Sequence, residues 1–245
     1  MNFTGIPYKS LPGRLLRLPL RLLPSWMMLP ILQGTLRGKW WIVGSGNHGY
    51  WLGSYELEKR RLFEKTIPRG SVVFDLGGNV GYYTLLASVL VGAQGRVYTI
   101  EPLPRNLRYL KEHLRRNHIH NVTVIEAAAT DQGGTAWFHE SQSTSKGHID
   151  PLGTIPVRTV ALDDLVGSGE LPQPEFLKID IEGGEFSALQ GAKQTLLKTH
   201  PVIFLSTHGQ DIHARCCQFL QTNGYSIRPT DGKPLERSRD ILASG

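Results

Sequence analysis

The sequence predicts an α/β protein with a mainly parallel sheet of seven strands and helices on both faces. From residue 71 onward, short apolar runs alternate with helical patterns, an order that is typical of parallel sheets. The segment 71–84 joins the first such run to the first helix through several glycines. The length of 245 residues fits one sizeable domain, predicted over 56–245, with an appendage over 1–55.

Strands are predicted where β-branched and aromatic residues form short runs, and helices where apolar residues recur every three or four positions. In chain order, the predicted strands span 71–76, 96–101, 122–127, 175–180, 201–207, 225–228 and 240–243. The predicted helices span 56–66, 80–91, 103–117, 184–198 and 211–222. A polar insert over 130–154 interrupts this order, and 134–140 with 155–161 are predicted to form a hairpin. The Gly- and aromatic-rich segment 40–55 is predicted to form a short hairpin or a lid.

The basic character of the chain belongs to the N-terminal segment 1–55. This segment holds six lysines and arginines and no acidic residue, while the other 21 basic residues match the 21 acidic ones. The balance argues against a nucleic-acid partner, which would require a basic stripe on the folded domain. Four prolines and three arginines within 11–32 argue against a transmembrane helix and a secretory signal. We therefore expect a cytoplasmic protein.

Two interpretations of the basic segment remain open. Either residues 1–38 lie on an anionic membrane surface as a peripheral contact, or they form an arm that packs over the domain. An organelle transit peptide ranks third, because the segment is rich in arginine and free of acids.

The turn after the first predicted strand carries the pattern D-x-G-G-N-x-G, formed by Asp75, Gly77, Gly78, Asn79 and Gly81. Such a turn lies at the carboxyl ends of parallel strands, where α/β proteins bind ligands. The pattern differs from the dinucleotide fingerprint G-x-G-x-x-G, because a carboxylate precedes the glycines. A carboxylate suits a cofactor with cationic or hydroxyl groups better than one with phosphates. S-adenosylmethionine meets this requirement.

Two further groups of acidic residues follow predicted strands. Glu101 ends the second strand, 26 residues after Asp75, where an acid can accept hydrogen bonds from ribose hydroxyls. Asp180 ends a buried strand, and Glu182 and Glu185 follow it. These acids either only stabilise the helix N-terminus, where the helix dipole is positive, or form part of the cofactor and substrate site. In the second case Asp180 faces the cofactor pocket, and Glu182 binds the substrate or acts as a base.

With these motifs, the chain resembles the FkbM-type S-adenosylmethionine-dependent methyltransferases over about residues 56–243. The resemblance rests on FDLGGNVGYYT (74–84), Glu101-Pro102 with Asn106, VRTVALDDL (157–165), LKIDIEGGEFSALQGA (177–192) and HPVIFLSTH (200–208). It implies a Rossmann-like class I methyltransferase fold and O-methylation of a sugar, glycan, lipid-linked or natural-product hydroxyl. The cofactor-binding residues that it implies are Asp75, Gly77, Gly78, Asn79, Gly81, Thr84, Glu101, Pro102, Asn106 and Asp180.

A sugar hydroxyl is a very weak acid, so methyl transfer to it requires a base. The candidate is His208 first, because it follows a strand next to that of Asp180, and then Asp180 and Glu182. The related family carries Glu two residues before this histidine, whereas this chain has Ser206. We therefore predict no metal site. The segments 40–55 and 130–154 are expected to shape the acceptor site, and the pattern predicts neither the acceptor nor the oligomeric state.

Two other classes of function compete with this prediction. A nucleotide-dependent oxidoreductase would carry the dinucleotide fingerprint, and Asp75 argues against it. A non-catalytic protein that retains the cofactor fold and is tethered to a membrane would not need Asp75, Glu101 and Asp180 together.

Overall fold

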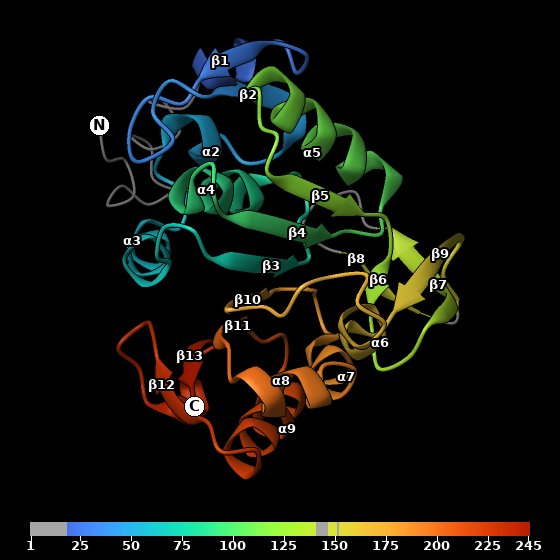
Figure 1. The fold of residues 1–245 in the computed structure, drawn as a ribbon. Coiled ribbons are helices and arrows are strands. Elements are labelled where there is room, and N and C mark those ends of the chain that lie inside the picture. Colours follow the sequence, from blue (N-terminus) through green and yellow to red (C-terminus); the bar gives the residue numbers. More distant parts are fainter. Residues whose placement is uncertain (1–18, 141–146, 151) are drawn as a thin grey trace.

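A seven-stranded, mainly parallel sheet forms the centre of the molecule, as the sequence predicts (Figure 1). The computed structural model describes residues 19–140, 147–150 and 152–245. The strands of this sheet are β3 (Val72–Leu76), β4 (Arg96–Ile100), β5 (Val122–Ile125), β10 (Phe176–Ile179), β11 (Val202–Ser206), β12 (Ser226–Pro229) and β13 (Asp240–Ser244). Their spatial order is β12-β13-β11-β10-β3-β4-β5, and within this sheet β13 alone runs antiparallel to its neighbours.

The central strands are apolar on both faces because helices cover both sides of the sheet. In β3, Val73 packs into one hydrophobic core and Phe74 into the other. Ile203 and Phe204 of β11 divide in the same way. Successive side chains of a strand point to opposite faces, so a strand buried on both faces is a continuous apolar run. This explains why these strands can be located from the sequence.

Helices α3, α4 and α5 cover one face of the sheet, and α6 to α9 cover the other (Figure 1). Their bounds are α3 (Leu57–Thr66), α4 (Tyr82–Val91), α5 (Pro104–Arg116), α6 (Leu162–Gly167), α7 (Glu185–Gln190), α8 (Lys193–Thr199) and α9 (Gln210–Thr222). No helix in the described ranges is long and apolar enough to cross a membrane.

The prediction of one helix over 184–198 is wrong, because α7 and α8 are separate. The carbonyl of Gly191 accepts a hydrogen bond from the backbone N–H of Asp163 at 2.7 Å. The Asp163 carboxylate then accepts the N–H groups of Gln194 and Thr195, both at 2.8 Å, and so caps the start of α8. A side chain at 191 would also collide with the carbonyl of Thr130, so only glycine fits at this break.

A smaller sheet stands beside the carboxyl ends of the central strands. It has the order β6-β9-β7-β8. Its strands are β6 (Ala128–Ala129), β7 (Gly134–Glu140), β8 (Gly147–Ile149) and β9 (Ile155–Val160). β7 pairs antiparallel with β9, which confirms the hairpin predicted from 134–140 and 155–161.

The chain before α3 folds onto the same face as α4. Its elements are the 3-10 turns η1 (Pro19–Leu22) and η2 (Val43–Ser45), the strands β1 (Met28–Pro30) and β2 (Trp40–Ile42), and α2 (Gly49–Leu52). The hairpin predicted within 40–55 is wrong, because β2 pairs with β1 and residues 49–52 are helical. Trp41 and Leu36 are buried in the core that also holds Phe63 of α3. The membrane contact that is one of the two interpretations of 1–38 falls partly on residues 1–18, outside the described residues.

Candidate active site

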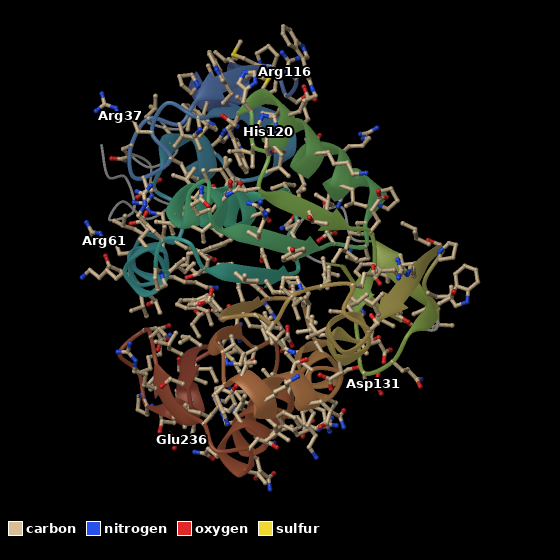
Figure 2. The ribbon with its side chains drawn as sticks, viewed as in Figure 1. Arg37, Arg61, Arg116, His120, Asp131 and Glu236 are labelled. Carbon is tan, nitrogen blue, oxygen red and sulfur yellow. The ribbon has the colours of Figure 1, made fainter. Side chains whose placement is uncertain are left out.

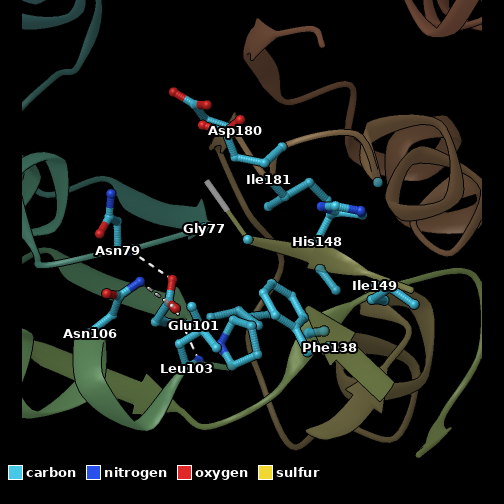
Figure 3. Close-up of a pocket in the computed structure, with 18 of the residues that line it drawn as sticks. Gly77, Asn79, Glu101, Leu103, Asn106, Phe138, His148, Ile149, Asp180 and Ile181 are labelled. Carbon is cyan, nitrogen blue, oxygen red and sulfur yellow. Dashed lines mark hydrogen bonds between the residues drawn. The ribbon is translucent and has the colours of Figure 1, made fainter. Parts of the chain in front are cut away.

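A cavity of about 640 Å³ opens at the carboxyl ends of β3, β4 and β10 (Figure 3). Three loops that follow these strands form its floor, namely 77–80, 101–103 and 180–184. Phe138 of β7 and His148 of β8 close it from the side of the smaller sheet. The chain therefore places its cavity at the sheet edge where parallel α/β proteins bind ligands.

The turn after β3 comes close to the turn after β10. Gly77 has a positive φ of 87°, and a side chain there would collide with the carbonyl of Asp180. A side chain at Gly78 would collide with the hydroxyl of Thr99 on β4. Glycine is thus required twice, once for the backbone conformation and once for space. As a result, this turn packs directly against the turn after β10 and against β4.

Glu101 is held rigidly at the cavity wall by the surrounding backbone. One carboxylate oxygen accepts the N–H of Asn79 at 2.8 Å. The other accepts the N–H of Leu103 and the side-chain amide of Asn106, both at 3.0 Å (Figure 3). Burial raises the pKa of Glu101, and these three donors oppose that shift. A carboxylate has about four acceptor positions, so Glu101 can accept a further hydrogen bond from a ligand.

Asp75 lies behind this wall and does not line the cavity. Its carboxylate pairs with Lys178 of β10 at 3.0 Å and accepts the hydroxyl hydrogen of Thr84 at 2.7 Å. Thr84 and Gly81 also lie outside the cavity lining, and Gly81 packs against Leu110. Asp75, Gly81 and Thr84, which the resemblance implies as cofactor-binding residues, therefore lie outside the cavity lining. These residues support the turn from behind.

The other predicted cofactor residues do line the cavity. They are Gly77, Gly78, Asn79, Glu101, Pro102, Asn106 and Asp180. Glu182, which the sequence offers as a substrate or base residue, lines it as well.

Asp180 is held in the ionised form by the cations around it. Its Oδ2 lies 3.4 Å from Nζ of Lys59 and 4.0 Å from Nζ of Lys178. Burial alone would raise the pKa of Asp180, but Lys59, then Lys178 and His208, outweigh burial and lower it. Asp180 is therefore a fixed negative charge at the cavity floor.

His208 follows β11 and stands next to the acids after β10. Its Nδ1 donates a hydrogen bond to the fully buried carboxylate of Glu185 at 2.8 Å. This bond directs Nε2 toward Glu182 at 3.6 Å and Asp180 at 3.9 Å. The hydrogen bond to Glu185 raises the pKa of His208 against the effect of burial. His208 itself is not part of the cavity lining and stands behind these two acids, which do line the cavity.

The same three side chains could also hold a divalent cation. One ligand atom each from Asp180, Glu182 and His208 lies within 4.8 Å of the others. The sequence predicts no metal site, and no motif in it indicates that Glu182 and His208 meet. Lys59 and Lys178 compete with a cation for Asp180, which favours proton transfer at this cluster over metal binding.

Several functional candidates lie outside the sequence motifs described above. Lys59 of α3 binds Asp180 and also Asp240 of β13, at 2.9 Å. Tyr50 and Tyr55 line the cavity, with ring centroids 4.3 Å apart. They come from the 40–55 segment, whose many aromatic residues were the available signal. No local pattern marks Lys59, because its partners are distant in sequence.

Comparison with known proteins agrees with this geometry. The family profile described as "Methyltransferase FkbM domain" matches residues 75–227. The chain is 28% identical over 150 residues to the hexuronic acid methyltransferase AglP of Haloferax volcanii, covering 60% of this chain and 61% of that protein. It is 25% identical over 158 residues to the 2-O-methyltransferase NoeI of Sinorhizobium fredii, covering 56% and 63%. The match thus spans about three fifths of each of these curated relatives.

Among solved structures, the chain is similar to a methyltransferase FkbM from Methylobacillus flagellatus. The TM-score is 0.53 at 23% identity, over 71% of this chain and 43% of that one. This similarity supports the fold described above.

Proposed function

This chain belongs to the FkbM methyltransferase family, and on that premise we propose that it methylates a hydroxyl oxygen of a sugar-like acceptor, with S-adenosylmethionine as donor. The observation that carries the proposal is Glu101, a buried carboxylate fixed by three donors with acceptor capacity left at the cavity wall. Such a group suits the paired hydroxyls of a ribose.

The charge around the cavity supports a cationic cofactor. The ammonium groups of Lys59 and Lys178 and the imidazole of His208 form ion pairs with six carboxylates in one connected network. The carboxylates of that network belong to Glu56, Asp75, Asp180, Glu182, Glu185 and Asp240. S-adenosylmethionine carries a sulfonium and an ammonium charge and no phosphate. Gly77 and Gly78 line the cavity and carry no side chain, so a cofactor can approach the backbone closely there.

The chain's own residues align the acceptor and remove its proton. Bound S-adenosylmethionine would supply an electrophilic methyl group to the acceptor oxygen, with its sulfur as the leaving group. Asp180 and Glu182 line the cavity and can orient the acceptor hydroxyl. The hydroxyl proton then passes by way of Glu182, which lines the cavity, to Nε2 of His208, while Glu185 holds Nδ1 and stabilises the imidazolium that forms.

The walls of the cavity fit a polar ring-shaped acceptor. Tyr50 and Tyr55 offer aromatic faces, and Thr130, Gln132 and His148 offer polar groups. AglP is named for a hexuronic acid and NoeI for a 2-O-methylation, and both support a sugar-like acceptor. The family match and the absence of the dinucleotide fingerprint weigh against a nucleotide-dependent oxidoreductase.

Calorimetry and mass spectrometry test the proposal together. We expect S-adenosylhomocysteine to bind to the full chain and NAD not to bind. Incubation of hexuronic acids and other free sugars with a labelled methyl donor should yield an O-methylated product. His208→Ala should keep S-adenosylhomocysteine affinity while losing transfer, and a chelator should leave transfer unchanged. Binding of NAD instead would contradict the proposal, and loss of transfer with the chelator would replace the base by a metal at this cluster.

A further inference from the structure

The β1–β2 hairpin is fixed firmly to the C-terminal end of α5. Asn117 accepts the backbone N–H of Trp40 at 2.7 Å and donates to its carbonyl at 2.9 Å. His113 accepts the N–H of Ile42 at 3.1 Å. On the inner side, Trp41 has no exposed surface. The outer side of the hairpin is therefore presented to solvent by a rigid support.

Large apolar side chains are exposed on and beside this hairpin. Trp26 is 78% exposed and Trp40 is 47% exposed. Leu22 and Leu32 are 82% and 53% exposed. Half of the large apolar side chains that are exposed in the described part of the chain thus lie within residues 22–40. This concentration requires a reason, because single exposed apolar residues are normally scattered.

The same region is strongly basic. Residues 19–55 contain no acidic residue, and in the hairpin connection Arg37 is exposed and Lys39 is half-buried. On α5, Arg115 and Arg116 are exposed at the end that holds the hairpin, where Glu112 is their only acidic partner on the helix. Figure 2 shows Arg116 beside the hairpin, at the top of the molecule.

We propose that this hairpin face, defined as Leu22, Trp26, Leu32, Arg37, Lys39, Trp40 and Arg116, docks on an anionic lipid bilayer. Tryptophan favours the membrane–water interface, and basic side chains favour anionic headgroups. The charge and the apolar side chains of this face favour an anionic bilayer over a second copy of the chain or a nucleic acid. A second copy would bring two basic faces together, and a nucleic acid would have no use for exposed leucines.

Vesicle co-sedimentation of the full chain tests the proposal. Phosphatidylcholine vesicles that contain phosphatidylserine should sediment the protein, pure phosphatidylcholine vesicles should not, and added salt should release it. The double variants Trp26→Ala/Trp40→Ala and Arg37→Glu/Lys39→Glu should each lower partitioning about tenfold or more. Trp137→Ala is the matched control, because Trp137 is 51% exposed, about as much as Trp40, but lies on β7. Circular dichroism checks that each variant is folded.

Three results would overturn the proposal. The first is no binding to anionic vesicles, and the second is an equal loss with Trp137→Ala. The third is light scattering that shows a dimer which the tryptophan variant converts to a monomer, because a second copy would then cover the face. Binding to RNA that depends on Arg37 and Lys39 but not on the tryptophans, without vesicle binding, would assign the face to nucleic acid instead.

Discussion

Glu101 and Asp75 are buried carboxylates at the ends of two adjacent strands, but their partners differ. Glu101 accepts hydrogen bonds from neutral amides and keeps acceptor capacity toward the cavity. Asp75 neutralises Lys178, a lysine that is 2% exposed inside the sheet. Glu101 lines the cavity, whereas Asp75 supports the turn from behind.

This difference predicts opposite effects for two isosteric substitutions. Glu101→Gln should weaken S-adenosylhomocysteine binding by about 1.5–3 kcal/mol, roughly ten- to a hundredfold, because a charge-assisted acceptor is lost. Asp75→Asn should instead lower the free energy of unfolding by about 3–5 kcal/mol, because the buried Lys178 loses its nearest counter-charge and keeps only the more distant Asp180. Calorimetry and urea-induced unfolding measure the two quantities. An Asp75→Asn variant with full stability and lost affinity would show that Asp75 contacts the ligand.

His208 predicts the pH dependence of the reaction. Its pKa is raised above 6.5 by the hydrogen bond to Glu185, and a base must be neutral to act. The rate of methyl transfer should therefore rise with pH, with a midpoint above 6.5. Glu185→Gln removes the charge that stabilises the imidazolium, so it should move the midpoint to lower pH. A midpoint that stays in place in this variant would exclude His208 as the base.

The raised pKa of His208 also affects stability, which should fall with rising pH while the activity rises. The folded state favours protonated His208, so this pairing stabilises the protein fully below the unfolded pKa and is lost as pH rises through the folded pKa. Activity should thus increase over the range in which this stabilisation fades. Unfolding by urea at pH values on either side of the midpoint, with His208→Gln as control, measures the loss.

At the scale of elements, the turn after β3 is built for close approach. Gly77 combines a left-handed backbone conformation with direct contact to the turn after β10. Gly70 shares the left-handed conformation, with φ of 84°, but no atom lies within 4 Å of the position that a Cβ would take there. Substitution of Gly70 therefore measures the cost of backbone strain alone, whereas substitution of Gly77 adds the cost of a steric collision.

Gly77→Ala should destabilise the protein by about 2–5 kcal/mol and abolish binding of S-adenosylhomocysteine. Gly70→Ala should cost only about 1–2 kcal/mol, because the conformational cost alone applies, and it should leave binding unchanged. Urea-induced unfolding and calorimetry again give both quantities. Equal costs for the two variants would mean that the turn after β10 moves aside without penalty.

At the scale of the whole molecule, residues that precede the family-matched region take part in both core and cavity. Trp41 and Phe63 are fully buried with α4, and Tyr50 and Tyr55 line the cavity. Lys59 joins this part of the chain to Asp180. The first described segments are thus packed into the structure that carries the site.

Two adjacent tryptophans test this arrangement. Trp41→Ala should lower the free energy of unfolding by about 3–5 kcal/mol, because a fully buried side chain is removed from the core. Trp40→Ala should change it by about 0.5 kcal/mol or less, because that side chain faces solvent. Thermal or urea unfolding compares them directly. Similar small losses would show that the hairpin packs loosely on the core.

Site residues that directly follow a strand could be predicted from the sequence, whereas those placed by contacts between distant segments could not. Glu101 and Asp180 could be assigned because each ends a strand, and parallel strand ends converge at one edge. The role of Asp75 could not be read from its own turn, since Lys178 decides it from the neighbouring strand. A lysine within the apolar run of β10 was the signal for that pair. Lys59 reaches the site through tertiary packing, which leaves no mark in sequence spacing.

The position of β13 has a consequence for how the protein is made. β13 follows every other strand along the chain, yet it lies between β11 and β12 in the sheet. Its Asp240 binds Lys59, which precedes the first strand of that sheet. During synthesis the ribosome must therefore release residues 240–244 before β12 can join the sheet and before Lys59 gains all its partners. We expect nascent chains that stop before residue 240 to remain incompletely folded and unable to retain the methyl donor.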